Sequence, residues 1–362
     1  MGRCCPENIF RMASVSRNGY RKNVVEKVKQ GVLLFREHFS STIKEREKEM
    51  VKYLGKRIAR SFLTLIIILT IVFCLLRLMP IEGYFPNFDK MTPQQIQVGL
   101  QEMGLTDPLP VQIVHFFQNL IHGDLGVSRI YRANVPVTEI LADKVPVSIK
   151  LGIISMIVAL LAGLPMGALM ARYKYRWFDK LGTLFIVCIQ AVPAAVYYLY
   201  IQLYGTQILD VGLLFKIDDP KYWVLPVISM SLNNIAFYGM WLRRYMVDES
   251  NKDYVKLARA KGMSESGVMF KHIFRNAFVP LAQYIPTAFL NTVIGSIYIE
   301  SLYSIPGMGG LLVTVIKKHD NTMVQGIVLL YACVGVLGLL LGDIMMVLLD
   351  PRISLGKKEG DR

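Results

Sequence analysis

One stretch of this chain combines small, cationic and turn-forming residues in an order that suits contact with another protein. The members of this nine-residue run that carry the argument are Tyr254, Lys256, Leu257, Ala258, Arg259, Ala260, Lys261 and Gly262. Its two alanines leave room for close approach, and its arginine and lysines offer charges that pair with acidic groups. These residues suit docking rather than bond cleavage; a plain basic loop beside a membrane is the alternative explanation.

Residue patterns that carry catalysis are missing from the sequence. A nucleotide-hydrolysing chain needs a glycine-rich phosphate loop ending in Lys and Ser or Thr, and no G-x-x-x-x-G-K-[ST] occurs. Neither G-x-S-x-G nor H-E-x-x-H occurs. The histidines (positions 38, 115, 122, 272 and 319) and cysteines (positions 4, 5, 74, 188 and 333) are too scattered for a metal site or disulfide framework. We therefore predict a non-catalytic chain without a metal or cofactor.

Two short helices are expected to position the docking residues. Asp253–Lys261 has a helical pattern, and Gly262 suits the left-handed conformation that ends a helix. Ser264 can cap a second helix that runs to about Phe274, with Glu265 in its first turn. Two capped helices joined by a glycine form a stiff projection, which a flexible loop would not.

Long apolar runs indicate that these helices hang from a membrane domain. The chain has 362 residues, of which 53% are hydrophobic. A bilayer core about 30 Å thick needs roughly 20 apolar residues in a helix. Six runs qualify: Ser61–Met79, Val145–Ala171, Leu181–Gly205, Trp223–Leu242, Ala277–Ile299 and Val324–Leu349. The fold class is therefore predicted to be an all-α polytopic membrane protein with six transmembrane helices.

The charges of the connecting segments alternate in sign. Residues 1–60 hold 15 Lys/Arg against 6 Asp/Glu, and the segment 80–144 holds 4 against 7. The segments 172–180 and 243–276 are again basic, whereas 206–222 is acidic and 300–323 is balanced. The positive-inside rule then places both termini and the loop 243–276 in the cytoplasm. The net charge of +14 is explained by this pattern, and no soluble basic domain favours nucleic-acid binding.

The predicted organisation follows from these spans. A basic tail (1–60) with a possible amphipathic helix at Val24–Phe39 precedes the first span (61–79). The segment 80–144 is read as a small external lid, in which Thr92 caps a helix that begins at Pro93. A five-helix core (145–350) contains the loop 243–276, and a short tail (351–362) follows.

Polar residues inside the spans are candidates for a transport path. They are Gln190, Asn233, Asn234, Gln283 and Asn291, together with the helix breakers Pro193 and Pro286; helix packing is the alternative role for all of them. Ionisable residues are few: Asp343 lies within a span, Lys150 and Glu300 lie near span edges, and Arg77 is expected to reach the headgroups. An ion-coupled secondary carrier is disfavoured, because neither a buried relay nor inverted repeats are visible.

The loop sequence resembles the B-type permease of the dipeptide/oligopeptide branch of ATP-binding-cassette importers. The resemblance rests on Tyr254–Gly262, on His272–Ala277, and on Pro280-Leu281. Lys256 stands where the general importer motif has Glu, and Phe274-Arg275 where it has Leu-Pro, as in the peptide branch. Further matching stretches, from about Val51 to Ile353, are Asp107-Pro108-Leu109, Gly123–Ser128, Pro136-Val137, Pro146, Gln190–Pro193, Leu225-Pro226, Glu300–Gly310 and Asp350–Ile353.

The resemblance implies a type I importer permease fold in a bacterial inner membrane, with the loop as the coupling site. It implies four kinds of partner: a second homologous permease, two cytoplasmic ATPases that bind ATP and Mg²⁺, an external peptide-binding protein, and membrane lipid. The implied cargo is peptides, and nickel or another small solute is the alternative within the family.

Overall fold

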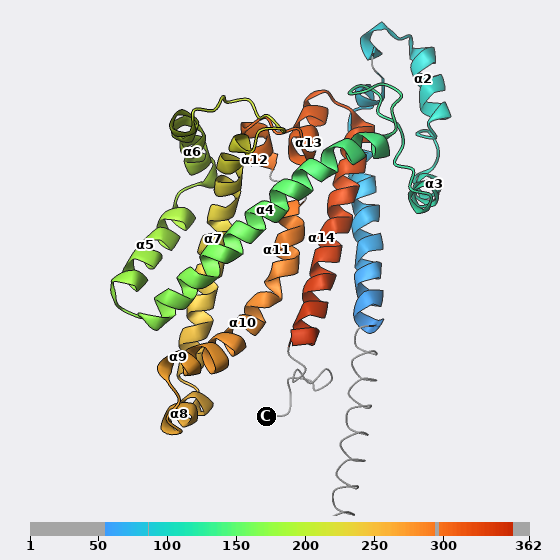
Figure 1. The fold of residues 1–362 in the computed structure, drawn as a ribbon. Coiled ribbons are helices and arrows are strands. Elements are labelled where there is room, and N and C mark those ends of the chain that lie inside the picture. Colours follow the sequence, from blue (N-terminus) through green and yellow to red (C-terminus); the bar gives the residue numbers. More distant parts are fainter. Residues whose placement is uncertain (1–54, 86, 294–296, 350–362) are drawn as a thin grey trace, which may run out of the picture. The chain divides into compact units, whose positions relative to one another are not determined.

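The computed structural model describes residues 55–85, 87–293 and 297–349 (Figure 1). Within them the regular structure is helical, apart from one isolated bridge between Val127 and Pro136. The chain divides into two compact units, Ala59–Arg352 and a unit made of Met1–Ile58 with Ile353–Arg362. The segment Val24–Phe39, for which an amphipathic helix and an ordinary tail were the alternatives, lies outside the described residues, as do most of the basic tail and the predicted C-terminal tail 351–362.

The long helices carry the apolar runs. They are Gly55–Leu76, α4 (Val137–Arg172), α5 (Trp177–Ala191), α6 (Ala194–Leu209), α7 (Lys221–Ser250), α10 (Arg275–Ala282), α11 (Tyr284–Val293) and α14 (Asn321–Leu349). Short helices connect them: η1 (Ile81–Tyr84), η2 (Phe88–Lys90), α2 (Pro93–Glu102), α3 (Leu109–Ile121), α8 (Asp253–Ala260), α9 (Glu265–Val268), the π-helix η3 (Met269–Phe274), α12 (Ile297–Leu302) and α13 (Met308–Lys317). The all-helical prediction is confirmed for the described residues.

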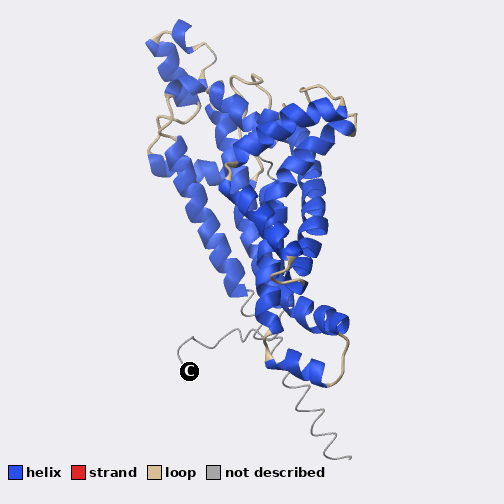
Figure 2. Ribbon diagram, turned by 90° about the vertical axis from the view of Figure 1, so that its left-hand side faces the viewer, coloured by secondary structure: helices blue, strands red, loops and turns tan. Residues whose placement is uncertain are grey.

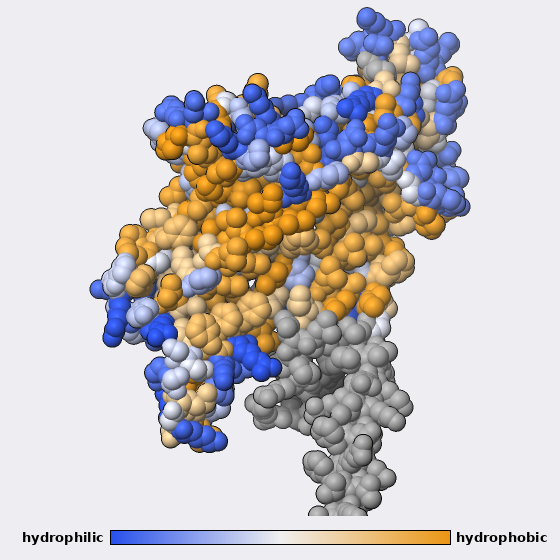
Figure 3. All heavy atoms as spheres, viewed as in Figure 1, coloured by the Kyte–Doolittle hydropathy of each residue, from blue (hydrophilic) through white to orange (hydrophobic). Residues whose placement is uncertain are grey.

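Three of the described helices are long and apolar enough to cross a membrane: Gly55–Leu76, α4 and the α14 segment Asn321–Met345. Two bent helix pairs raise that number to five if each pair is one span. The fourth predicted span lies inside the 30-residue helix α7, which is not among them. Asn233 and Asn234 lower the hydropathy of that helix at its centre. Figure 3 shows a broad hydrophobic band between two hydrophilic ends.

The third predicted span is not one straight helix. α5 and α6 are bent by 104° at Val192–Pro193. Pro193 lacks the N–H that would continue the helix, and it forces the preceding residue out of the helical region. Val192 accordingly has an extended backbone, with φ −87° and ψ 129°. The predicted span Leu181–Gly205 therefore corresponds to a bent helix pair, and the bend lies at Pro193, one of the two prolines expected to interrupt a span.

Close contact between α4 and α7 depends on glycine. A Cβ atom added to Gly167 would lie 2.6 Å from the carbonyl oxygen of Gly239, and one added to Gly163 would lie 3.0 Å from that of Ile235. Such small-residue contacts let two helix backbones approach in a membrane, where packing replaces the hydrophobic effect. These two helices form the centre of the bundle, from which α8 projects at one end and α2 and α3 at the other (Figures 1 and 2).

The lid segment is fixed to the bundle by a buried carboxylate. Oδ2 of Asp320, just before α14, accepts hydrogen bonds from the hydroxyl of Ser128 (2.7 Å) and from the backbone N–H groups of residues 129–131 (2.9–3.2 Å). Oδ1 of Asp320 accepts a hydrogen bond from the backbone N–H of Met323 (3.1 Å), and this bond caps α14. Asp320 is fully buried. The predicted capping of α2 by Thr92 is confirmed, with Gln95 completing a capping box.

Candidate docking site

The predicted two-helix loop is present. α8 covers Asp253–Ala260, and Gly262 has a positive φ of 78°. The hydroxyl of Ser264 accepts a hydrogen bond from the backbone N–H of Gly267 (3.2 Å), so that it caps α9 as predicted. The second helix then continues without interruption, as the π-helix to Phe274 and as α10 beyond it. The loop therefore ends in a helix that enters the bundle.

Side chains within the chain clamp the loop. The guanidinium of Arg259 makes two contacts with the carboxylate of Glu265 (3.0 and 3.3 Å), which tie α8 to α9 across the glycine turn. The hydroxyl of Tyr254 donates to Glu249 at the end of α7, and it accepts from the side-chain amide of Asn276 on α10 (2.8 Å). These contacts join four consecutive helices into one element.

The two faces of α8 differ. Val255 is fully buried and Ala258 is 5% exposed, in a cluster with Val268 and Ile273. On the outer face, Leu257 is 56% exposed, and Ala260 and Lys261 are exposed beside it. The two alanines therefore have different surroundings. Ala258 packs against its own chain, whereas Ala260 is exposed. The outer face has Leu257, Ala260 and Lys261 available for a second protein.

The charges of α8 are only partly available for a partner. Lys256 pairs with Asp253 (2.9 Å), and the hydrogen bond from Lys256 lowers the pKa of the Asp253 carboxyl. Arg259, expected to pair with a partner, is instead occupied by Glu265. Within the described residues Lys261 has no ion-pair partner. Partial burial and the hydrogen bond to Glu249 raise the pKa of the Tyr254 hydroxyl.

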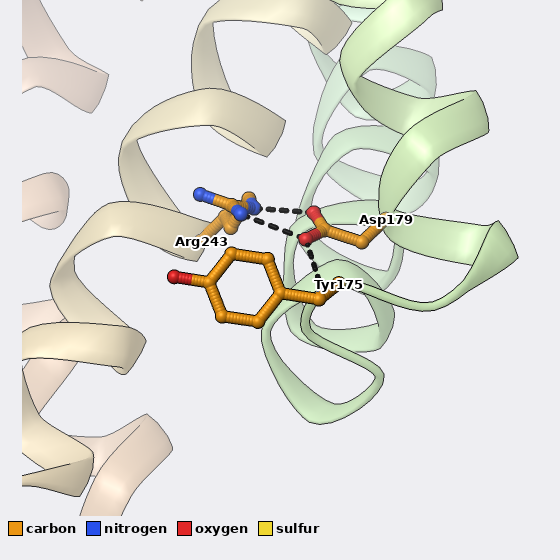
Figure 4. Close-up of polar contacts among 3 residues, drawn as sticks. All are labelled: Tyr175, Asp179 and Arg243. Carbon is orange, nitrogen blue, oxygen red and sulfur yellow. Dashed lines mark hydrogen bonds and ion pairs between the residues drawn. The ribbon is translucent and has the colours of Figure 1, made fainter.

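An ion pair between the buried Asp179 and the half-buried Arg243 supports the end of α7 that leads into the loop. The carboxylate of Asp179, at the start of α5, accepts hydrogen bonds from Nε and Nη2 of Arg243 (2.5 and 2.8 Å). It also accepts one from the backbone N–H of Tyr175 (2.8 Å). Figure 4 shows the carboxylate directed from the α4–α5 turn toward α7. Such a two-point Arg–carboxylate contact fixes orientation as well as distance. The sequence places both residues in basic segments but gives no sign that they meet.

Three of the five candidate path residues lie on three different helices: Gln190 on α5, Asn233 on α7 and Asn291 on α11. Asn233, Phe237 and Met240 share a face by their helical spacing. The side-chain amide of Gln190 lies 3.7 Å from the Met240 sulfur. The Tyr284 ring is 6.0 Å from the Phe237 ring between centroids, and Asn291 follows two turns along α11. Gln190, Asn233 and Asn291 are all exposed in this chain.

The other two candidates turn toward helix contacts. Asn234 is half-buried, four residues before Tyr238 on the α4-facing side of α7. Gln283 is also half-buried, and its carbonyl oxygen would lie 2.8 Å from a Cβ at Gly342 of α14. Pro193 stands at the α5–α6 bend and Pro286 lies inside α11. Helix packing therefore accounts for part of the polar set.

Sequence reasoning missed several residues that hold these sites. Glu249, Glu265 and Asn276 clamp the docking loop, and Asp179 supports it. Glu300, which the sequence analysis puts near a span edge, is fully buried. Its carboxylate accepts hydrogen bonds from the hydroxyl of Ser148 (2.8 Å) and from the backbone N–H of Gly309 (2.6 Å) at the start of α13. Arg77 lies over the Phe73 ring and contacts the Tyr84 hydroxyl (3.3 Å), so its guanidinium is engaged within the protein. No cluster of three or more His, Cys, Asp or Glu suited to a metal occurs in the described part of the chain.

Comparison with known proteins identifies the class of this chain. Residues 163–355 match the inner membrane component of binding-protein-dependent transport systems, and residues 50–152 match the N-terminal region of such membrane components. The oligopeptide transport system permease protein AmiC of Streptococcus pneumoniae is 37% identical over 58% of this chain. That alignment spans 42% of AmiC, less than half of the relative's length.

Two other relatives align over nearly their whole length. The dipeptide transport system permease protein DppB of Lactococcus lactis is 32% identical over 84% of this chain and 100% of DppB. The glutathione transport system permease protein GsiC of Salmonella typhimurium is 32% identical over 84% of this chain and 99% of GsiC. On these matches, the chain belongs to the family of inner membrane components of binding-protein-dependent transport systems.

Proposed function

We propose that this permease moves short peptides into a bacterial cell as half of the pathway of an ATP-driven importer. The relatives named above are permeases for oligopeptides, dipeptides and glutathione, itself a tripeptide. Few charges lie within the predicted spans, and neutral hydrogen-bonding groups suit a cargo whose side chains vary. The external binding protein, rather than this chain, would select among peptides.

The clamped loop carries the proposal. Separate ATPase subunits that hold ATP and Mg²⁺ would dock on the outer face of α8, around Leu257, Ala260 and Lys261. Leu257 is 56% exposed on the outer face of α8, and the small exposed side chain of Ala260 leaves room there for close approach of a partner. The buried face of α8 supports force transmission, because Val255 and Ala258 pack against Val268 and Ile273 and so keep the loop from yielding when it is pushed.

We infer a type I importer permease fold with six spans and both termini in the cytoplasm. The first span is assigned to 61–79, the external lid to 80–144, and the remaining five spans to 145–350, with the tails 1–60 and 351–362 inside. The alternating segment charges support this orientation. The length of α7, 30 residues, supports its crossing despite two central asparagines, since roughly 20 residues suffice.

The second half of the pathway would come from a homologous permease. Gln190, Asn233 and Asn291 are exposed in this chain, within or beside apolar helices. Exposed amides are costly against lipid, so a partner chain or a water-filled path would cover them. A path between two permeases meets that requirement.

Uptake of a toxic peptide tests the function. A strain that lacks this gene should survive a toxic di- or tripeptide, and the restored gene should return sensitivity. The complex reconstituted with its ATPases should import labelled trialanine only when ATP is hydrolysed. Equal sensitivity of both strains to every peptide would overturn the peptide assignment; uptake with hydrolysis blocked would overturn the ATP-driven one. Import of nickel alone would point to the other branch of the family.

A further inference from the structure

The turn between α4 and α5 carries positive charge that no neighbouring side chain neutralises. Four exposed cations lie in the segment 172–180: Arg172, Lys174, Arg176 and Lys180. The segment has one acidic residue, Asp179, which is buried and is already occupied by Arg243. Within the described residues, none of the four cations forms an ion pair. The exposed surface of this turn is therefore suited to an anion.

Aromatic rings lie among these cations. Tyr175 and Trp177 are 76% and 60% exposed, and the Phe178 ring stacks on that of Trp177. The ammonium group of Lys174 lies 4.8 Å from the centre of the Tyr175 ring. Tyrosine and tryptophan are enriched where a membrane meets water, because each joins an apolar ring to a polar O–H or N–H group. The composition of the turn thus indicates a membrane interface.

Helix α5 continues from the turn with one buried and one exposed face. Its buried residues are Asp179, Gly182 and Ile186. On the other side Trp177, Leu181 and Leu184 recur at helical spacing, and each is more than half exposed. Figure 3 shows a hydrophilic edge beside the hydrophobic band at the place where Figure 1 puts the α4–α5 turn. Cations, aromatic rings and aliphatic side chains therefore follow one another along one surface.

A phospholipid has its groups in the same order. The headgroup carries the charge, the glycerol region lies at the interface, and the acyl chains are aliphatic. A soluble anion would match only the cations of the turn, and a soluble protein would not reach the aliphatic face of a helix within the bilayer. Basic residues at a membrane surface attract acidic lipids. An acidic phospholipid therefore fits all three parts of the surface.

We propose that the α4–α5 turn binds the headgroup of an acidic phospholipid, whose acyl chains lie along Trp177, Leu181 and Leu184. The turn also contacts the docking loop, because Nη1 of Arg172 donates a hydrogen bond to the Ser266 hydroxyl (3.4 Å). A lipid held here would brace the turn beside the loop. The inference rests on the proposed inward orientation of the turn, and it adds a lipid site to the proposed importer.

A pair of matched double variants tests the site in the full complex, purified in lipid nanodiscs. Lys174→Gln/Lys180→Gln removes two exposed cations of the turn without breaking an ion pair within the described residues. Lys216→Gln/Lys221→Gln is the control. It removes two exposed lysines, and so the same charge, from the segment 206–222, which also exposes Leu213 and Leu214 but contains three acidic residues.

The measurement is photo-crosslinking by a trace of lipid with a diazirine in its acyl chain, either phosphatidylglycerol or phosphatidylcholine, in nanodiscs of phosphatidylcholine. In the wild type and the control, phosphatidylglycerol should label residues 177–188 about five- to tenfold more than phosphatidylcholine does. The two lipids should label these residues about equally in Lys174→Gln/Lys180→Gln. Salt at 1 M should remove most of the preference in the wild type without any substitution.

The outcomes separate this site from the proposed function. If both lipids label α5 equally in the wild type, or if the turn variant keeps the wild-type preference, the lipid site is wrong and peptide import stands. If neither lipid labels α5 in the complex, a protein partner covers this face and the lipid site is again wrong. If the preference depends on Lys174 and Lys180 and yet no peptide is imported, the lipid site stands and the proposed function falls.

Discussion

The docking loop Asp253–Phe274 and the lid segment project from opposite ends of the bundle and are held by different chemistry (Figure 2). The lid depends on Asp320, a fully buried carboxylate with five hydrogen bonds. The ion pair of the loop joins Arg259 and Glu265, whose side chains are 42% and 69% exposed. Buried carboxylates that satisfy backbone donors are costly to lose, whereas exposed ion pairs contribute little. The lid is therefore fixed firmly, and the loop is shaped mainly by its backbone and its buried face.

Replacement of Asp320 should have the largest effect. Asp320→Ala would leave a hydroxyl and four buried N–H groups without an acceptor, and should cost about 3–5 kcal/mol of stability. The midpoint of thermal unfolding of the purified complex should fall, and proteolysis should cut first in the segment 124–136. Asp143→Ala is the control, since Asp143 is 60% exposed and makes one long contact with Arg132, at 3.4 Å. Equal effects of the two changes would refute the anchoring role of Asp320.

The two alanines of α8 should respond differently to charge. Ala258→Asp would place a carboxylate at a 5% exposed position and should destabilise the loop by about 2–3 kcal/mol. Ala260→Asp, on the exposed face, should leave stability nearly unchanged but reduce ATP-driven uptake by disturbing the docking surface. Thermal unfolding and uptake, measured side by side, distinguish the two. If both variants were stable and active, the docking assignment would have to be abandoned.

The glycine turn offers a smaller, purely conformational test. Gly262 has a φ of 78°, and a Cβ there would meet no atom within 4 Å. Gly262→Val should therefore cost about 1–2 kcal/mol through backbone strain alone, and Gly262→Asn should cost much less. Hydrogen exchange of the α9 amides should speed up in the valine variant. Similar exchange in the two variants would mean that the turn does not need the left-handed conformation.

The exposed ion pair should show the smallest effect. A double-mutant cycle of Arg259→Gln and Glu265→Gln should give a coupling energy of about 0.2–1 kcal/mol. That energy should shrink at 1 M salt, because the Debye length falls to about 3 Å. A coupling energy above 2 kcal/mol would show that the loop, like the lid, depends on a strong polar anchor.

Local signals were enough to predict much of the docking loop. Gly262 ends one helix and Ser264 caps the next, and each signal acts within four residues of its effect. The pairing of Arg259 with Glu265 also lies within the loop, but it appears only once the angle of the turn is known. Which alanine faces inward depends on the helices of the bundle, which the run itself does not specify.

Contacts between distant residues were beyond the sequence. Asp320 accepts hydrogen bonds from a turn about 190 residues earlier in the chain, and no residue pattern near either segment indicates that the two meet. Pro193 was expected to interrupt its span, but the size of the bend there, 104°, could not be predicted, because Pro146, Pro165 and Pro226 lie inside helices that continue. A proline in the sequence marks a position where a helix lacks one hydrogen bond. Whether the chain bends there depends on the packing around it.

The glycine contact between α4 and α7 also has a mechanical meaning. At 1.5 Å per residue, α7 is about 45 Å long, and Gly239 lies roughly two-thirds of the way toward the docking loop. Where two backbones touch, neither can slide without a clash, but one can tilt on the other. Such a point is a fulcrum: a small thrust on the short arm, near the loop, becomes a longer sweep at the far end of the long arm, where α7 packs against α6 and α12.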